Sequence, residues 1–379
     1  MIGKKNIFKN INLYVPLTVF LLVLIGLLAI SSALEINKPD SSGMWFLKKQ
    51  MVAVFLGIIG IIAVQFFDYK VFKHYYNIIY LITIAVLVYI LLTAQIVAGG
   101  RRWFILGPLH FQPSEIAKIL LILVLAAILD QKKDNLKYLS GFIVPFIYMI
   151  IPFGLIILQN DLGTALVVLV IFIVMLYIAG ANRKFMMIIF GGSLLLIIAI
   201  IFLHLVFEVP VPFLQKHQLN RLIVFINPRV DPQGISYNLI QSKIAIGSGE
   251  IFGKGLFGGT QNQLNFLPEK HTDFIFSVIG EEFGFLGCSI VILLFLFLLW
   301  QLINVAREAK DTYGALVITG ITAMFFFHIF ENIGMTMGVM PITGIPLPFI
   351  SYGGSSMVSS LIAIGLVINI NRRKRKLRF

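Results

Sequence analysis

The sequence predicts an all-α, polytopic membrane protein with about ten transmembrane helices. Hydrophobic residues make up 59% of the 379 residues and charged residues only 12%, and the mean hydropathy is +0.95. A soluble globular domain does not have this composition. Apolar runs of about 18 or more residues recur along the chain, and each is long enough to cross a bilayer as a helix. We therefore expect one integral membrane domain over residues 1–379.

The predicted spans follow one another closely except at one place. They lie near residues 11–33, 49–67, 75–97, 113–130, 141–159, 162–180, 185–207, 273–304, 312–334 and 352–370. A long loop over about 208–272 separates the seventh span from the eighth. Ten crossings put both termini on the same side of the membrane.

The basic residues predict which side that is. The N-terminus, alternate connections and the C-terminal tail hold 18 of the 30 lysines and arginines, whereas the short connections on the other side hold five. Cytoplasmic connections are enriched in these residues, so we expect cytoplasmic termini and an extracytoplasmic long loop. The formal charge of +13 then reflects topology, and no nucleic-acid partner is predicted. The first apolar run is a span and not a cleavable signal peptide.

The long loop is expected to be structured. Residues 236–246 predict a short amphipathic helix at the outer membrane interface. Six glycines between 247 and 259 then predict tight turns or close backbone approaches. A flexible linker is the alternative, but the phenylalanines and leucines among these glycines are too apolar for a solvated one.

The strongest candidate for chemistry is the stretch 265–284, which carries four carboxylates, one histidine and one lysine. The pattern turns apolar at about Thr272, which predicts Asp273 in the first turn of a helix with Thr272 as the N-cap. A carboxylate there is favoured by the helix dipole. The alternative is that Asp273 only caps a helix that packs through Gly280 and Gly284.

Ionisable residues inside the membrane are expensive and therefore suggest function. Gln112, Glu115 and Lys118 recur at three-residue spacing and lie along one side of the fourth span. Asp161 closes a tight outer turn, so we expect Lys118 and Asp161 to pair across adjacent helices. Such a pair either takes part in the chemistry or only fixes helix register. Glu331 is placed towards the same outer face.

Two further segments on the outer face are candidates for a functional role. Arg101 and Arg102 break the positive-inside bias, and a pair of guanidiniums suits an anionic lipid head such as a phosphate or pyrophosphate. Ordinary anchoring to membrane phospholipids is the alternative. The segment 341–356 contains three prolines and three glycines. It predicts a rigid re-entrant loop whose backbone must be satisfied by protein or water.

Five motifs occur in order along the chain and resemble one family. They are QPSEIAK at 112–118, QNDLGTA at 159–165, SKIAIGSG at 242–249, LPEKHTDF at 267–274 and PLPFISYGGSS at 346–356. Together they resemble the SEDS family of shape, elongation, division and sporulation proteins. The stretch GGTQNQLNFLPE at 258–269 is similar to the elongation branch and not to the division branch. Asn160 departs from the family, which usually has proline there.

The resemblance implies a peptidoglycan glycosyltransferase of the bacterial cell membrane that polymerises lipid II into a growing glycan strand at the outer face. It also implies a class B penicillin-binding transpeptidase as partner. Asp273 matches the family's essential aspartate. We expect it to act as the general base in a direct displacement of undecaprenyl pyrophosphate, which needs no second carboxylate.

The leaving group needs cations beside it. The candidates are Arg101, Arg102, Lys118 and Lys243, and the other expected supporting residues are Glu115, Asp161, Glu269, Lys270, His271 and Ser351. The sequence establishes no cofactor. A divalent cation, Mg²⁺ or Mn²⁺, is a further candidate, but the alternate spacing of Glu269, His271 and Asp273 is a weak metal-binding signal.

Two other functions are compatible with a membrane protein of this family. A lipid II flippase would need polar residues along a path through both leaflets, and the inner halves of the predicted spans carry none. A scaffold that holds the transpeptidase does not exclude an enzyme.

Overall fold

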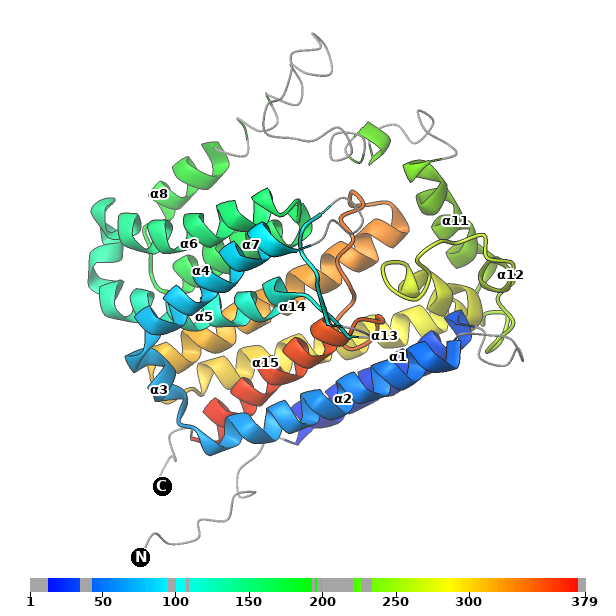
Figure 1. Cartoon of the computed structure of the whole chain (residues 1–379), viewed down its shortest axis with the longest axis horizontal. Coiled ribbons are helices and arrows are strands. Elements are labelled where there is room, and N and C mark those ends of the chain that lie inside the picture. The colour runs from blue at the N-terminus through cyan, green and yellow to red at the C-terminus, as the bar shows by residue number, and fades with distance from the viewer. Residues whose placement is uncertain are drawn as a thin grey trace, which may run out of the picture.

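The structure is a computed structural model and describes residues 13–34, 43–94, 100–106, 109–192, 195, 199, 221, 223–225 and 234–373. Its elements are α1 (Tyr14–Ala33), α2 (Gly43–Phe66), α3 (Tyr69–His74), α4 (Tyr76–Thr93), β1 (Phe104–Leu106), β2 (Leu109–Phe111), α5 (Pro113–Lys132), η1 (Lys133–Lys137), α6 (Ser140–Leu158), α7 (Leu162–Ile178), α8 (Arg183–Met186), η2 (Met187–Gly191), α11 (Ile235–Ser248), α12 (Thr260–Gln263), α13 (Ile275–Arg307), α14 (Thr312–Met337) and α15 (Gly354–Arg372). The long helices form one bundle (Figure 1). The predicted all-α class is confirmed, with one small addition: β1 and β2 pair as a short antiparallel hairpin.

Nine of the ten predicted spans coincide with long described helices. Seven of these, α1, α2, α4, α6, α13, α14 and α15, are long and apolar enough to cross a membrane. Helix α7 is apolar but has 17 residues, and α5 has 20 residues but carries Glu115 and Lys118. The chain is therefore a multi-pass membrane protein. The tenth predicted span, over 185–207, lies mostly outside the described residues, and α8 and η2 occupy its beginning.

Contacts between elements define two ends of the bundle. At one end, here called the terminal end, Tyr69 donates to Asp311 at 2.7 Å and Arg373 pairs with Asp68. Helix α1 begins and α15 ends there (Figure 1). At the opposite end, called the site end, the start of α5 meets the start of α15, where the Gln112 amide donates to Ser355 Oγ at 2.9 Å.

The path of the chain agrees with an even number of crossings. It leaves α7 at the terminal end, where the Asn182 amide donates to the Leu136 carbonyl at 3.2 Å. It is at the site end in α11, where Ser242 Oγ lies 2.6 Å from Ser277 Oγ near the start of α13. Asn182 and α11 therefore lie at opposite ends of the bundle.

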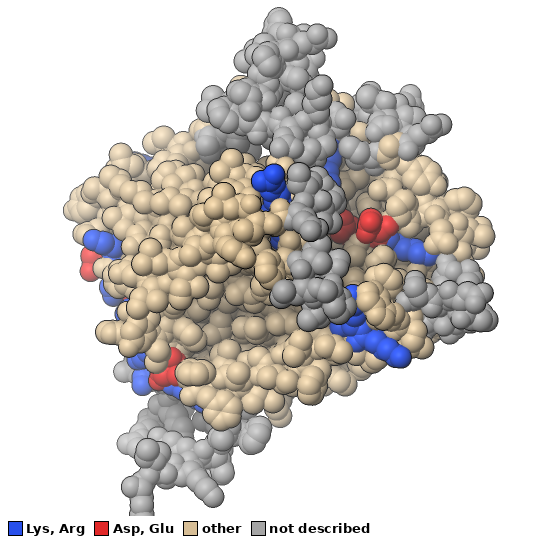
Figure 2. Space-filling model, in the orientation of Figure 1, with Lys and Arg blue, Asp and Glu red and all other residues tan. Residues whose placement is uncertain are grey.

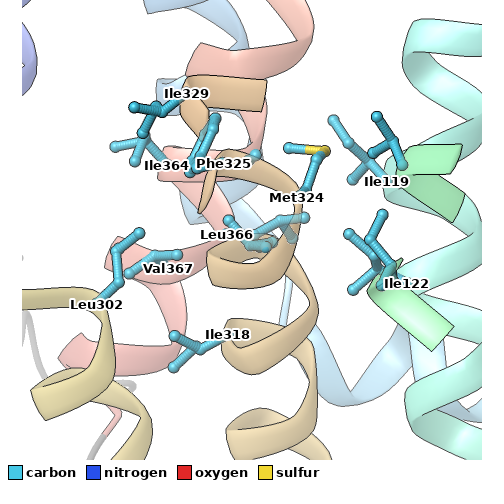
Figure 3. Packing of buried hydrophobic residues seen from close by; sticks show 14 of the residues in the cluster. Ile119, Ile122, Leu302, Ile318, Met324, Phe325, Ile329, Ile364, Leu366 and Val367 are labelled. Atoms are coloured by element: carbon cyan, nitrogen blue, oxygen red, sulfur yellow. The ribbon is translucent and has the colours of Figure 1, made fainter. Parts of the chain in front are cut away.

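Helix α14 lies at the centre of the core. Its apolar side chains pack between those of α5 on one side and those of α13 and α15 on the other (Figure 3). Helices α14 and α15 are mostly buried, whereas α2 and α4 are mostly exposed. Figure 2 shows charged side chains at the left edge and in the right half of the molecule, with a broad uncharged zone between them. A bilayer would surround such a zone.

Helix boundaries follow their capping residues. Asp161 accepts a hydrogen bond from the Thr164 amide at 3.1 Å and so caps α7, and Asp311 caps α14 in the same way through Gly314. Helix α13 bends at Gly284, whose φ of 63° is left-handed. The amide of Phe285 then donates to the Glu250 carbonyl at 2.8 Å. The bend therefore docks the glycine-rich part of the long loop onto α13.

Candidate functional site

Asp273 lies in a turn before α13 and not in the first turn of the helix. Helix α13 begins at Ile275, and the Thr272 hydroxyl donates to Glu269 Oε2 at 3.0 Å, so Thr272 does not cap the helix. The predicted N-cap is therefore wrong. The Glu269 carbonyl accepts the amides of Thr272 and Phe274 at 3.2 and 3.3 Å, and this tight turn replaces the expected first helical turn. The carboxylate of Asp273 is therefore surrounded by loop residues and not by the first turn of a helix.

The segment 338–353, between α14 and α15, passes directly beside the carboxylate. Gly344 has a left-handed φ of 77°, and a Cβ added there would lie 3.2 Å from Asp273 Oδ2. Any side chain at this position would be strained and would press on the carboxylate. Asn332 of α14 joins the two segments, because its Nδ2 donates to the Asp273 carbonyl at 2.9 Å and to the Ile345 carbonyl at 2.8 Å.

The protein satisfies the backbone of this segment, as the sequence predicts. Ser351 Oγ donates to the Thr272 carbonyl at 2.7 Å and accepts the Leu347 amide at 2.8 Å. Gln50 of α2 donates to the Ser351 carbonyl and accepts the Gly353 amide. The segment is non-helical up to Gly353, and α15 begins at the next residue, Gly354. These bonds hold the two segments that flank the carboxylate as one unit.

The pKa of Asp273 is raised from 3.8 to about 6, chiefly by burial and also by the nearby charge of Glu269, while the positive charges of Arg221 and Arg102 oppose the rise. Arg221 Nη1 donates to the Thr343 carbonyl at 3.3 Å, beside Gly344. Two guanidiniums from distant parts of the chain therefore act on one carboxylate that can accept a proton near neutral pH.

Lys118 and Asp161 do not pair, so this prediction is wrong. Asp161 accepts from Thr164 of α7 and from Gln112 Nε2 at 3.0 Å, and Arg102 Nη1 lies 3.7 Å away. Its capping role turns the carboxylate towards the site end. Lys118 lies a turn and a half deeper in α5 than Gln112, and its partners come from the helices around it.

The partners of Lys118 form a buried cluster beneath the segment 338–353. Lys118 Nζ donates to Glu115 Oε1 at 2.8 Å and lies 2.9 Å from His328 Nε2. Ser359 donates to Glu115 Oε2 at 3.2 Å, and His328 Nδ1 lies 3.3 Å from the Pro346 carbonyl. Only 1% of Lys118 is exposed. The cluster is therefore a support for the segment and is not placed to stabilise a leaving group.

Other predicted residues hold the loops. Lys270 Nζ donates to the Asn262 carbonyl at 2.5 Å and to Asn265 Oδ1 at 2.8 Å. Lys243, on the surface of α11, lies against Gly338 at the end of α14. The His271 ring packs 5.5 Å from that of Tyr352. Arg101 is exposed, so it can meet a ligand only at the surface of the site.

Two of the four carboxylates in the stretch 265–284 have structural roles. Glu281 accepts from Lys254 Nζ and the Gln261 amide, each at 2.8 Å, and so anchors α12 to α13. Glu282 accepts from Ser32 of α1 and from Asn262. Asp273 and Glu269 remain as the carboxylates of the site.

The residues near Asp273 do not make a ligand set for a divalent cation. Within the described part of the chain, no group of three or more histidine, cysteine, aspartate or glutamate side chains is arranged to hold a metal. His271 lies between aromatic rings.

Asn332 is expected to be essential for the position of the base. In Asn332→Leu, which keeps the approximate size, the carbonyls of Asp273 and Ile345 lose their donor, and each buried unsatisfied group costs about 1 to 3 kcal/mol. We expect a lower melting temperature and a much lower turnover rate. Asn332→Gln, which keeps the donor on a longer side chain, should recover part of the stability. Unchanged turnover in a folded Leu variant would refute this role.

Comparison with known proteins identifies the family. Residues 12–376 match the model of the cell-cycle protein family that comprises FtsW, RodA and SpoVE. The chain belongs to this family. A relative from Escherichia coli, named peptidoglycan glycosyltransferase MrdB, is 34% identical and covers 99% of this chain and 98% of its own. Another, a probable peptidoglycan glycosyltransferase FtsW from Trichlorobacter lovleyi, is 35% identical and covers 95% of this chain and 93% of its own.

Solved structures of the family share the fold. The crystal structure of Thermus thermophilus RodA is 27% identical, with a TM-score of 0.71 over 97% of this chain and 99% of that one. A chain from a study of a peptidoglycan synthase complex is 29% identical, with a TM-score of 0.80 over 97% of this chain and all of that one. Members named FtsW and MrdB are almost equally similar to this chain, so overall identity does not separate the branches.

Proposed function

We propose that the chain is a peptidoglycan glycosyltransferase that polymerises lipid II during cell-wall elongation, with Asp273 as its general base. The observation that carries the proposal is a carboxylate that lies beside Gly344, has a pKa of about 6 and is influenced by two arginines, on a residue whose backbone carbonyl is held by Asn332. A base with a pKa near the working pH is the most effective proton acceptor. The names of the MrdB and RodA relatives support the same reaction.

The reaction is a single displacement. Asp273 takes the proton from the 4-hydroxyl of the acceptor N-acetylglucosamine, and that oxygen attacks C1 of the donor N-acetylmuramic acid. The bond from C1 to the pyrophosphate oxygen breaks, and undecaprenyl pyrophosphate leaves with the electron pair. Attack opposite the leaving group converts an α-linked donor into a β-linked product, so no second carboxylate nucleophile is needed.

Arg102 and Arg221 are placed to stabilise the leaving pyrophosphate. Guanidiniums bind phosphate oxygens bidentately, and preorganised cations stabilise charge that develops in the transition state. Arg102 is held by its contact with Asp161, and Arg221 by the Thr343 carbonyl. Arg101 is exposed next to Arg102 and supports entry of the anionic head from the surface.

The location of the site supports an extracytoplasmic reaction. The described basic residues of the predicted cytoplasmic connections lie at the terminal end, which by the positive-inside rule supports a cytoplasmic terminal end and an extracytoplasmic Asp273. We propose a class B penicillin-binding transpeptidase as partner, in agreement with the peptidoglycan synthase complex that supplied a similar structure. Membrane lipids surround the uncharged zone.

An enzyme is favoured over a flippase. A flippase requires a polar path from one end of the bundle to the other. Below the Lys118 cluster, the described parts of α5, α13, α14 and α15 fill the interior mostly with apolar side chains (Figure 3). Buried polar side chains also occur there, at Gln301, Asn369 and Asn371, and Asn369 is bonded to the backbone carbonyls of Val64 and Phe67.

The pH dependence of polymerisation tests the role of Asp273. The base works only when deprotonated, so kcat/KM should fall on the acid side with a midpoint near pH 6. Glu269→Gln should move this midpoint to lower pH and Arg221→Gln to higher pH, because Glu269 raises the pKa and Arg221 lowers it. A midpoint that neither variant moves would refute the assignment.

The Asp273 carboxyl also makes stability depend on pH, but with the opposite sign: activity rises with pH whereas stability falls. The folded chain holds this proton at a higher pH than the unfolded chain, so between about pH 3.8 and 6 the contribution of Asp273 to stability decreases as pH rises.

A further inference from the structure

A cavity at the terminal end is lined almost entirely by hydrogen-bond donors. It has a volume of about 330 Å³ and lies where α3, α4 and the end of α5 meet, and its lining residues are Lys70, Lys73, His74, Tyr76 and Gln131. None of these is a carboxylate, and the two lysines are the charged groups of the lining. It lies at the opposite end of the bundle from Asp273 and takes no part in the proposed reaction.

Both lysines have N–H donors left to bind a ligand. Lys73 Nζ lies 2.5 Å from Asp130 Oδ2, and Lys70 Nζ lies 3.2 Å from Asp311 Oδ2. An ammonium group has three N–H donors, so one carboxylate partner does not saturate it. The lysine side chains are 38% and 52% exposed, which leaves the cations accessible from the cavity.

The cavity lies where a helix enters the hydrocarbon. Tyr76, which lines it, is the first residue of the predicted membrane-spanning helix α4. The apolar side chains of Ile78, Leu81 and Ile82, on the first turns of the same helix, are all exposed. A ligand with a negative head and apolar tails would place its head in the cavity and its tails in the hydrocarbon around α4. A soluble anion would use only the cavity.

We propose that this cavity binds the phosphodiester headgroup of an anionic phospholipid, with the acyl chains along the exposed face of α4. Lys70 and Lys73 would bind the phosphate, and the donors of His74, Tyr76 and Gln131 would bind the remaining headgroup oxygens. Basic pockets between helices at the cytoplasmic side of a membrane are suited to such lipids. The lipid would fix the junction of α3 with α4 and α5.

Native mass spectrometry of the full-length protein with a mixture of phosphatidylglycerol and phosphatidylcholine tests the proposal. The wild type should retain phosphatidylglycerol in preference. Lys70→Gln with Lys73→Gln should lose this preference by about thirtyfold, which is about 2 kcal/mol for two lysines at an anionic surface. Lys137→Gln with Lys184→Gln removes the same charge from exposed positions at the same end and should leave the preference intact.

A further variant separates binding from structure. Asp130→Asn frees Lys73 from its carboxylate and should strengthen retention of phosphatidylglycerol. If the Lys73–Asp130 pair were purely structural, Asp130→Asn would weaken retention just as Lys73→Gln does. Lys70→Arg with Lys73→Arg keeps the charge and should retain the lipid. The proposal is wrong if the control variant loses as much lipid, if Asp130→Asn weakens retention, or if millimolar inorganic phosphate or a polyglutamate peptide displaces the lipid.

Discussion

Asp273→Asn is expected to lower the rate of glycan polymerisation by about 10² to 10⁴-fold while the protein stays folded. The amide has nearly the size of the carboxylate but cannot take a proton at useful pH. The backbone bond from Asn332 to the Asp273 carbonyl does not involve the side chain, so the turn before α13 should persist. The amide carries no charge, so stability is expected to be unchanged below about pH 4 and slightly higher above about pH 6, where Asp273 is charged and burial disfavours the charged form.

Glu269→Gln is the matched control for this change. It also converts a carboxylate of the site to an amide, and the new side-chain oxygen can still accept from Thr272. Polymerisation at pH 7 should be retained, because loss of the Glu269 charge lowers the pKa of Asp273 and keeps the base deprotonated. Glu281 and Glu282 should not replace Asp273, since both are held by the loop and by α1. Near-normal activity of Asp273→Asn would remove Asp273 from the base role.

Lys118→Met is expected to destabilise the protein by about 3 to 5 kcal/mol, because it leaves Glu115 charged and uncompensated in the bundle. Glu115 is 4% exposed, and its other oxygen accepts from Ser359. The double variant Glu115→Gln with Lys118→Met should be less destabilised than Lys118→Met alone. Unfolding of purified protein in detergent measures both.

A second double variant serves as the control for this pair. Lys118→Met with Asp161→Asn should show additive losses, because the two side chains have different partners and do not touch. Additive losses for Glu115 with Lys118, or a strong coupling between Lys118 and Asp161, would contradict the structure. Lys118→Met should also slow polymerisation, since His328 connects this cluster to the Pro346 carbonyl.

The transmembrane helices were predictable because the bilayer imposes their length. An apolar run of sufficient length has few alternatives to a helix in hydrocarbon, and nine predicted spans coincide with described helices. The non-helical segment after α14 was predictable for a related reason. Its prolines and glycines cannot continue a helix, and Gly338 ends α14 in a left-handed conformation.

The details of the site were less predictable because they depend on how distant segments meet. Thr272 is a good N-cap residue by type, but Glu269 competes for its hydroxyl. Lys118 and Asp161 lie near the ends of nearby helices, yet His328 of α14 lies within hydrogen-bonding distance of Lys118. Arg221 lies within the predicted long loop over 208–272 and outside the five motifs, so nothing in the local sequence indicated that it acts on Asp273. Asn332 stands beside Glu331 in an apolar helix, and that buried polar pair was the one available signal.

The central claim is that this chain forms glycosidic bonds itself. The most direct test is incubation of the purified full-length protein, in detergent and with its transpeptidase partner, with labelled lipid II, followed by electrophoresis of the products. Detergent abolishes any requirement for transport across a membrane. We expect a ladder of glycan strands that depends on Asp273. Absence of strands from a folded, partner-bound chain, together with movement of lipid II across vesicle membranes by the same preparation, would contradict it.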